Sequence, residues 1–218
     1  MLANLKAMKE AGKVRKVVVR YPQGWLYKMF EKSGKNMQAS WRCNPKLSGI
    51  AGCMGDIGVH AANLAEFITG LKITEVLADL TTFVKGRLLD DDGSVLLHFE
   101  KGAKGILEST QVGPGEENDL QIWVYGEEKA LGWMQENPNY LRVISQTEPE
   151  QVWKRGNPYV AAKSPEAGRC TRTPSGHPEA FFEAFANNYM NFTDTIRAKQ
   201  EKRKPTALEL DFPGVEAG

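Results

Sequence analysis

Residues 94–111, with the sequence SVLLHFEKGAKGILESTQ, indicate the fold class. The runs 94–99 and 104–111 are rich in apolar and β-branched residues, which is typical of strands. Only a short turn around Lys101-Gly102 separates the two runs. Parallel strands need a crossover of about a dozen residues or more, so these two strands are expected to pair antiparallel.

The same pattern extends in both directions along the chain. Further strands are expected at 14–20, 73–84, 119–125, 129–134 and 140–144, with one short strand at 37–42. Glycine turns at Asp92-Gly93 and Gly126 join neighbouring runs. The sequence therefore predicts an open, predominantly antiparallel sheet over residues 73–144.

Three helices are expected around this sheet. Residues 56–69 repeat apolar side chains at steps of three and four, and Gly70 is placed to cap the helix. Similar patterns predict helices over 2–11 and 179–199, whereas 145–178 is a polar stretch without a clear period. The predicted fold is a single α+β domain over residues 1–218, with the helices on one face of the sheet.

Composition excludes several classes of function. The chain has 28 Lys and Arg against 27 Asp and Glu, a net charge of +1, so there is no basic excess for nucleic acid or an anionic membrane. No apolar run approaches the ~18–20 residues that cross a bilayer. Three cysteines without a CxxC spacing favour a reducing compartment. We expect a cytoplasmic protein without a nucleic-acid or membrane partner.

Asp56 and His60 form the first candidate site. Four residues apart at the start of a helix, they share one face, and a carboxylate beside an imidazole can orient the ring for acid–base catalysis. The alternative is that Asp56 only caps the helix and His60 is an ordinary surface or core residue. Glycines on either side of Asp56 favour close approach of a ligand or of another backbone segment.

Two further positions carry weaker signals. Trp41-Arg42 offers an indole and a guanidinium that could stack on a planar ring and bind a phosphate, or the tryptophan could simply be a core aromatic at a strand end. His177 precedes the last helix and Glu179 falls in its first turn, which by itself indicates a helix start.

Other chemistries are not expected. The three histidines form no HxxxH or HxH pair, so no metal site is predicted. The sequence also contains no GxSxG nucleophile motif and no GxGxxG motif for a dinucleotide pyrophosphate.

Several separated segments together resemble the C-terminal domain of the glucose-fructose oxidoreductase / inositol dehydrogenase / MocA family. They are Trp41-Arg42, SGIAGCMGDIGVHAANLAEFITGL (48–71), ADLTTFV (78–84), LLHFEKGAKGILESTQ (96–111) and GHPEAFFEAFANNY (176–189). The resemblance covers nearly all of residues 1–215. It implies a dihydrodipicolinate-reductase-like C-terminal domain from an enzyme that transfers a hydride between nicotinamide and a sugar or polyol.

The resemblance also implies roles for individual residues. His60 would be the acid/base at the substrate, and Asp56 would orient it or bind substrate. Trp41 and Arg42 would reach the cofactor, NAD or NADP, and His177 would lie near the sugar pocket. No metal is implied. The resemblance implies that this domain makes a dimer interface, and a sheet face without helices predicts a homodimer, or a dimer of dimers, through the sheet.

The sequence departs from the family in one large respect. The Rossmann domain and its Glu-Lys-Pro motif have no counterpart here, so the main cofactor site is expected to be absent and the 218 residues alone are expected to be inactive. The alternative is a non-catalytic carbohydrate-binding or dimerisation module that has lost its nucleotide-binding half.

Overall fold

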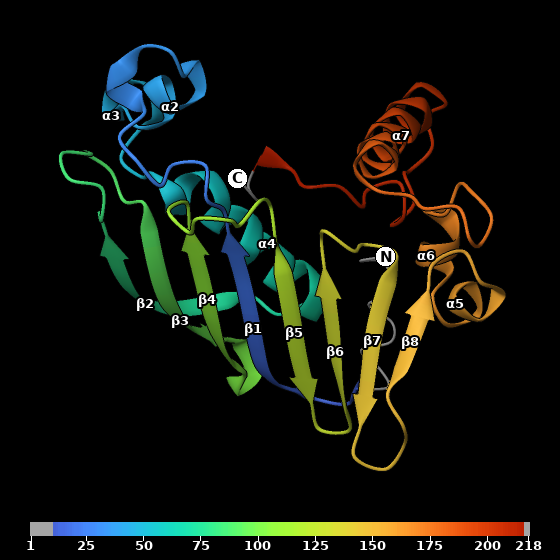
Figure 1. Cartoon of the computed structure of the whole chain (residues 1–218). Helices are drawn as coiled ribbons and strands as arrows, with labels where there is room; N and C mark the ends of the chain where they lie inside the picture. The colour runs from blue at the N-terminus through green and yellow to red at the C-terminus, as the bar shows by residue number, and fades with distance from the viewer. Residues whose placement is uncertain (1–10, 216–218) are drawn as a thin grey trace.

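A computed structural model describes residues 11–215, which form one eight-stranded sheet with helices on one side (Figure 1). The strand order is β2-β3-β4-β1-β5-β6-β7-β8. The strands are β1 (Val14–Pro22), β2 (Ile73–Thr81), β3 (Asp92–Phe99), β4 (Lys104–Thr110), β5 (Gln121–Gly126), β6 (Lys129–Met134), β7 (Tyr140–Ser145) and β8 (Gln151–Lys154). The open, predominantly antiparallel α+β fold predicted from the sequence is confirmed.

Only one pair of neighbouring strands in this sheet is parallel. β1 lies at the centre and runs parallel to β4, with Val18 opposite Ile106, while its other neighbour, β5, is antiparallel. The connection from β1 to β4 is long enough for a parallel pair and includes α4 (Val59–Thr69) as its main helix. Because β1 and β4 point the same way, the loops that leave them meet at one edge of the sheet.

The core lies between the sheet and α4. Strand residues that point to this side alternate with exposed ones, as in the pattern of β3 and β4. Val17 and Val19 of β1 are fully buried, and they share one apolar cluster with Ala61, Leu64 and Ala65 of α4. Small side chains on α4 let it pack closely on the sheet. Gly70 ends α4 in a left-handed conformation, as predicted.

The opposite face of the sheet is not covered by helices (Figure 1). A row of mainly apolar residues in register crosses it from β2 to β5: Leu77, Leu96, Ile106, Val18 and Trp123. Leu77 and Leu96 are 69% and 50% exposed. This row is an apolar band on an otherwise polar open face.

The strand predicted over 37–42 is wrong, because Met37–Arg42 is helix α2. Asn36 precedes it in an extended conformation, and its side-chain oxygen accepts a hydrogen bond from the Ala39 N–H. The short helix α3 (Pro45–Ser48) follows, with Asn44 as its cap. Both helices belong to a lobe above the sheet that has its own small core of Leu26, Ala39 and Cys43.

The stretch 145–178 is more ordered than its sequence indicates. It contains β8 and two short helices, α5 (Pro158–Lys163) and α6 (Pro165–Arg169). Val160 of α5 and Ala167 of α6 join the main core cluster beside Trp153 of β8. The helix predicted over 2–11 falls, apart from Ala11, outside the described residues.

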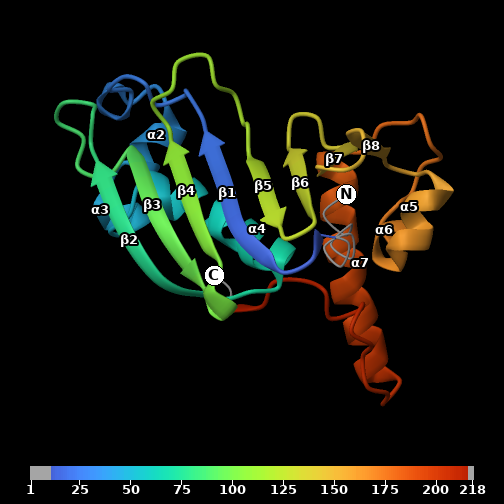
Figure 2. The ribbon, with the colours of Figure 1, turned by 90° about the horizontal axis from the view of Figure 1, so that it is seen from below.

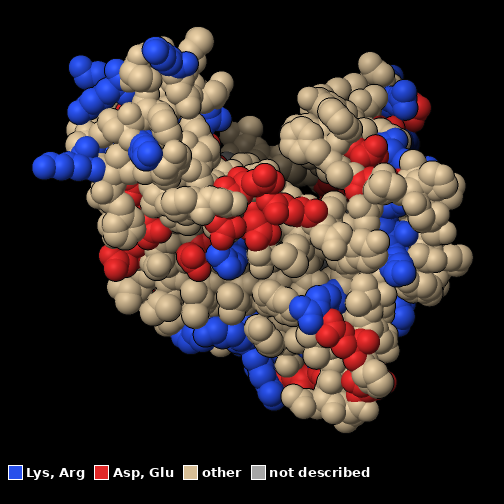
Figure 3. Space-filling view, in the orientation of Figure 1, with Lys and Arg blue, Asp and Glu red and all other residues tan. Residues whose placement is uncertain are grey.

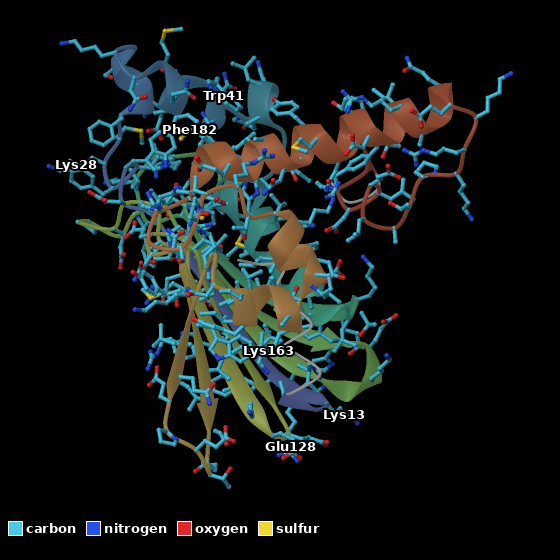
Figure 4. All side chains as sticks on the ribbon, turned by 90° about the vertical axis from the view of Figure 1, so that its right-hand side faces the viewer. Lys13, Lys28, Trp41, Glu128, Lys163 and Phe182 are labelled. Atoms are coloured by element: carbon cyan, nitrogen blue, oxygen red, sulfur yellow. The ribbon has the colours of Figure 1, made fainter. Side chains whose placement is uncertain are left out.

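The last helix, α7 (Phe181–Gln200), confirms a prediction to within two residues at each end. It extends past the sheet on the side of α4 (Figures 2 and 4). Its aromatic face, which includes Phe182 and Tyr189, is largely exposed. Its buried positions are Asn191 and Ala198.

Candidate functional site

A pocket of about 350 Å³ lies at the edge of the sheet that is formed by the C-terminal ends of its strands β1 and β4. Its lining includes Trp41, Arg42, Asp56, Asp90 and Gln111. Figure 3 shows the molecule hollowed at this edge, between the lobe with α2 and the segment that leads into α7. Three of the predicted site residues therefore line one pocket.

Asp56 is held by two donors from other parts of the chain. The Arg42 Nε lies 3.2 Å from one carboxylate oxygen, and the Gln111 Nε2 donates to the other at 2.7 Å. Gln111 is 2% exposed, whereas the side chains of Asp56 and Arg42 are each 29% exposed. The carboxylate is thus fixed in orientation but still open to the pocket.

Asp56 does not cap its helix. A π-helical turn, η3 (Met54–Gly58), precedes α4, and Asp56 lies inside it. Asp90 binds the backbone at the start of this turn, because its carboxylate accepts hydrogen bonds from the N–H groups of Gly52 and Met54 at 2.6 and 2.8 Å. A Cβ on Gly52 would lie 2.1 Å from the Asp90 carbonyl oxygen, so this close approach requires glycine.

His60 lies on the first turn of α4 with its ring exposed. Its ring contacts Tyr21 edge-on, with the centroids 6.4 Å apart. Within the described residues, no hydrogen bond joins His60 to Asp56. The spacing argument assumes 3.6 residues per turn, whereas the turn that contains Asp56 is π-helical. The sequence predicted that Asp56 and His60 lie side by side. In the structure Asp56 instead binds Arg42 and Gln111, and His60 contacts Tyr21.

Trp41 and Arg42 form a stacked pair at the end of α2. The Arg42 guanidinium carbon lies 4.3 Å from the centroid of the Trp41 ring and 5.9 Å from that of Trp25. Trp41 is 41% exposed, so part of its indole remains open. Because Arg42 also binds Asp56 and Gln38, its charge is largely satisfied within the protein. The pair is better suited to stacking than to binding a free phosphate.

A buried ion network attaches the α2 lobe to the sheet. The Arg87 side chain is 1% exposed, and its nitrogens lie 2.8 Å from Glu31 and 3.0 Å from Asp91. Burial opposes ionisation of Glu31, but the hydrogen bond and charge of Arg87 outweigh it, so the pKa of Glu31 is lowered. Arg87 also lines the pocket.

His177 is not among the residues that line this pocket. It lies in an exposed loop whose backbone is held by a buried pair, Arg155 and Glu179, 3.0 Å apart. The His177 carbonyl accepts hydrogen bonds from Arg155 and Thr173. Glu179 precedes α7, whose first residue is Phe181, so its interpretation as a first-turn residue is wrong.

Three residues of the site were not found from the sequence: Gln111, Asp90 and Arg87. Each acts on a residue far away along the chain, and although Gln111 ends the segment 96–111, nothing in that segment indicates its partner. The glycines before Asp56 were the one available signal, since Gly52 marks the point where Asp90 approaches.

Residues 11–215 contain no group of three or more His, Cys, Asp or Glu side chains placed to hold a metal ion. Within the same residues, no helix is both long enough and apolar enough to span a membrane.

These features define an α+β domain with a polar pocket at one edge of an open sheet and no nucleotide-binding Rossmann segment in its described part. Residues 2–131 match the model of the GFO/IDH/MocA C-terminal domain. The match covers more than half of the chain, so the protein belongs to the GFO/IDH/MocA family of oxidoreductases.

Individual relatives agree with this assignment. The chain is 30% identical to the uncharacterised oxidoreductase YfiI of Bacillus subtilis, covering 100% of this chain and 56% of the relative. A solved oxidoreductase from Sinorhizobium meliloti is 38% identical, with a TM-score of 0.81, and the match covers 100% of this chain and 55% of that one.

The third relative is an inositol dehydrogenase homologue from Azotobacter vinelandii. In its complex with NAD⁺ this homologue matches with 31% sequence identity and a TM-score of 0.89. The match covers 99% of this chain and 56% of the homologue. A second structure of this homologue holds NADH and myo-inositol. The chain therefore spans about half the length of the relatives that it matches.

Proposed function

We propose that this chain is the substrate-binding and catalytic half of an NAD(P)-dependent oxidoreductase that acts on a sugar or polyol. The observation that carries the proposal is the pocket lined by Asp56, Arg42 and Trp41, in a domain whose family includes a relative solved with NADH and myo-inositol. Neutral polyols suit this site, because a fixed carboxylate that is still open to the pocket can accept hydrogen bonds from hydroxyls.

The residues present fit only the reactive end of the cofactor. The described residues contain no glycine-rich turn between a strand and a helix to hold a pyrophosphate, and the Arg42 charge is already paired. The half-exposed Trp41 ring offers a flat surface against which a nicotinamide could lie. The nucleotide would be held by a second domain. The relatives are long enough to contain one, because this chain covers only about half of their length.

His60 is assigned as the acid/base. In the oxidation direction His60 would take the proton of the substrate hydroxyl, while a bound NAD(P)⁺ would supply the hydride acceptor, so that the alcohol becomes a carbonyl. Reduction reverses these transfers. Asp56, fixed by Arg42 and Gln111, is placed to accept a hydrogen bond from a substrate hydroxyl.

A turnover assay tests this function. The chain is supplied with a nucleotide-binding half, as a fusion or in trans, and NADH and NADPH formation is followed with myo-inositol and a panel of sugars and polyols. We expect reduction with at least one of them and none without the added half. Lack of turnover with every compound, from a correctly folded assembly, would contradict the proposal.

We further propose that the open sheet face forms a homodimer, which could itself pair into a dimer of dimers. A large apolar band is rarely left in water by a monomer. On the pocket side of the apolar row the register places Asp79, Glu108 and Arg20, and on the other side it places Glu75, Lys104 and Lys16. A two-fold axis parallel to the row would place Asp79 and Glu108 of one copy on the same side as Lys16 and Lys104 of the other.

Light scattering at micromolar concentration is expected to give a dimer for the natural chain and a monomer for Leu96→Glu. Leu96 is in the centre of the row, so a buried unpaired carboxylate there would oppose association. Leu47→Glu, which changes an exposed leucine on α3, is the matched control and should remain dimeric. A natural chain that is cleanly monomeric would exclude this interface.

A further inference from the structure

A second polar cluster lies beside the pocket, where β1 ends and β5 begins. It consists of Tyr21, Gln23, Trp25 and Asn118, which are connected by hydrogen bonds through their side chains. Tyr21 contacts His60, and Trp25 lies against Arg42. The cluster therefore touches two residues of the proposed site, but the roles assigned above do not use it.

The chemistry of Trp25 fixes the orientation of the amides. An indole N–H can only donate, and Trp25 Nε1 lies 2.9 Å from Gln23 Oε1, so the other end of the Gln23 amide is its NH₂ group. That NH₂ group donates to Asn118 Oδ1 at 2.7 Å. The Asn118 Nδ2 must then point away from Gln23.

Asn118 is exposed, yet hydrogen bonds fix both its side-chain oxygen and its backbone. Its Oδ1 also accepts from the Tyr21 hydroxyl at 2.6 Å. Its backbone N–H donates to Glu136 at 2.9 Å, and its carbonyl accepts from Gln135 at 3.0 Å. Its Nδ2 is the one polar group of this residue without a hydrogen bond in the described chain.

We propose that Asn118 is a substrate-binding residue whose Nδ2 donates to a hydroxyl or carbonyl oxygen of the substrate. This inference rests on the proposed function and deepens it, by placing a second polar contact on the far side of Tyr21 from His60. A neutral donor that is already held in place costs little conformational entropy on binding. It suits an uncharged polyhydroxy compound long enough to reach from the acid/base to Asn118.

The substitution Asn118→Asp tests the assignment, because it keeps an oxygen for Tyr21 and Gln23 and replaces only the NH₂ group by an acceptor. In the assembly with the nucleotide-binding half, we expect KM for the polyol to rise about tenfold, as for a lost hydrogen bond. The kcat and the affinity for NADH should stay unchanged. Asn137→Asp, on the turn between β6 and β7, adds the same charge nearby and should leave KM unchanged.

An NMR titration of the natural 218-residue chain with myo-inositol and with D-glucose gives a readout that needs no turnover. We expect the side-chain amide signals of Asn118 to shift and those of Asn137 to stay. Turnover with an unchanged KM in Asn118→Asp would overturn the Asn118 assignment and leave the proposed function intact. An Asn118 shift without any turnover would overturn the proposed function and support the binding site. Neither turnover nor a shift would overturn both.

Discussion

Replacing His60 with alanine is expected to lower kcat by about 10²-fold or more in the assembly with a nucleotide-binding half, the usual scale for loss of an acid/base. The ring is exposed on the first turn of α4 and contacts the ring of Tyr21. The substitution should therefore leave the stability of the chain nearly unchanged. Steady-state kinetics and a denaturant titration on the same preparation check both expectations.

His98→Ala is the matched control for this experiment. His98 is on β3, pairs with Glu75 and points to the open face of the sheet, away from α4. It should retain the natural kcat. If His60→Ala also retained it, His60 would not be the acid/base, which would have to come from another residue.

Replacing Arg87 with methionine is expected to lower the free energy of unfolding by about 3–5 kcal/mol, the range for removing one partner of a buried ion pair. The substitution leaves Glu31 and Asp91 without their counter-charge, and Asp91 is 1% exposed. Urea unfolding of the 218-residue chain measures the loss. Arg203→Met, which breaks an exposed ion pair with Glu209, should have a small effect by comparison.

The pH dependence distinguishes a lost ion pair from lost packing. The pKa of Glu31 is lowered in the folded chain, so its contribution is complete above its ordinary value of about 4.5 and is lost as the pH falls through the lowered value. The stability difference between the natural chain and Arg87→Met should therefore shrink in acid. A difference that stays constant down to that range would assign the effect to packing.

Local pattern was sufficient to predict most of the sheet. Strands β3 and β4 alternate buried and exposed residues, and a short turn leaves antiparallel pairing as the only option. The parallel pairing of β1 with β4 was not predictable in this way. It depends on a crossover whose packing against the sheet is a long-range property.

The errors arise where distant contacts decide the structure. Residues 37–42 become helical because Asn36 caps them and the lobe core of Leu26 and Ala39 holds them. The loop with His177 is ordered by Arg155, which comes from the end of β8. Neither contact leaves a periodic signal in the sequence.

The site was partly predictable for the same reason. The sequence paired Asp56 with His60 and Arg42 with Trp41, whereas the structure joins Asp56 to Arg42 by an ion pair. Gln111 completes the carboxylate's hydrogen bonds from the end of β4, and only the fold places it there. Local motifs indicated candidate residues, and the topology determined which residues they contact.

The proposed function requires that a separate nucleotide-binding half, and not this chain, holds most of the cofactor. Fluorescence titration with NADH and NADPH, first with the 218 residues alone and then with the second half added, tests it most directly. We predict no tight binding by the chain alone and tight binding by the assembly. Tight binding by the chain alone would contradict the account, because it would require a cofactor site within these residues.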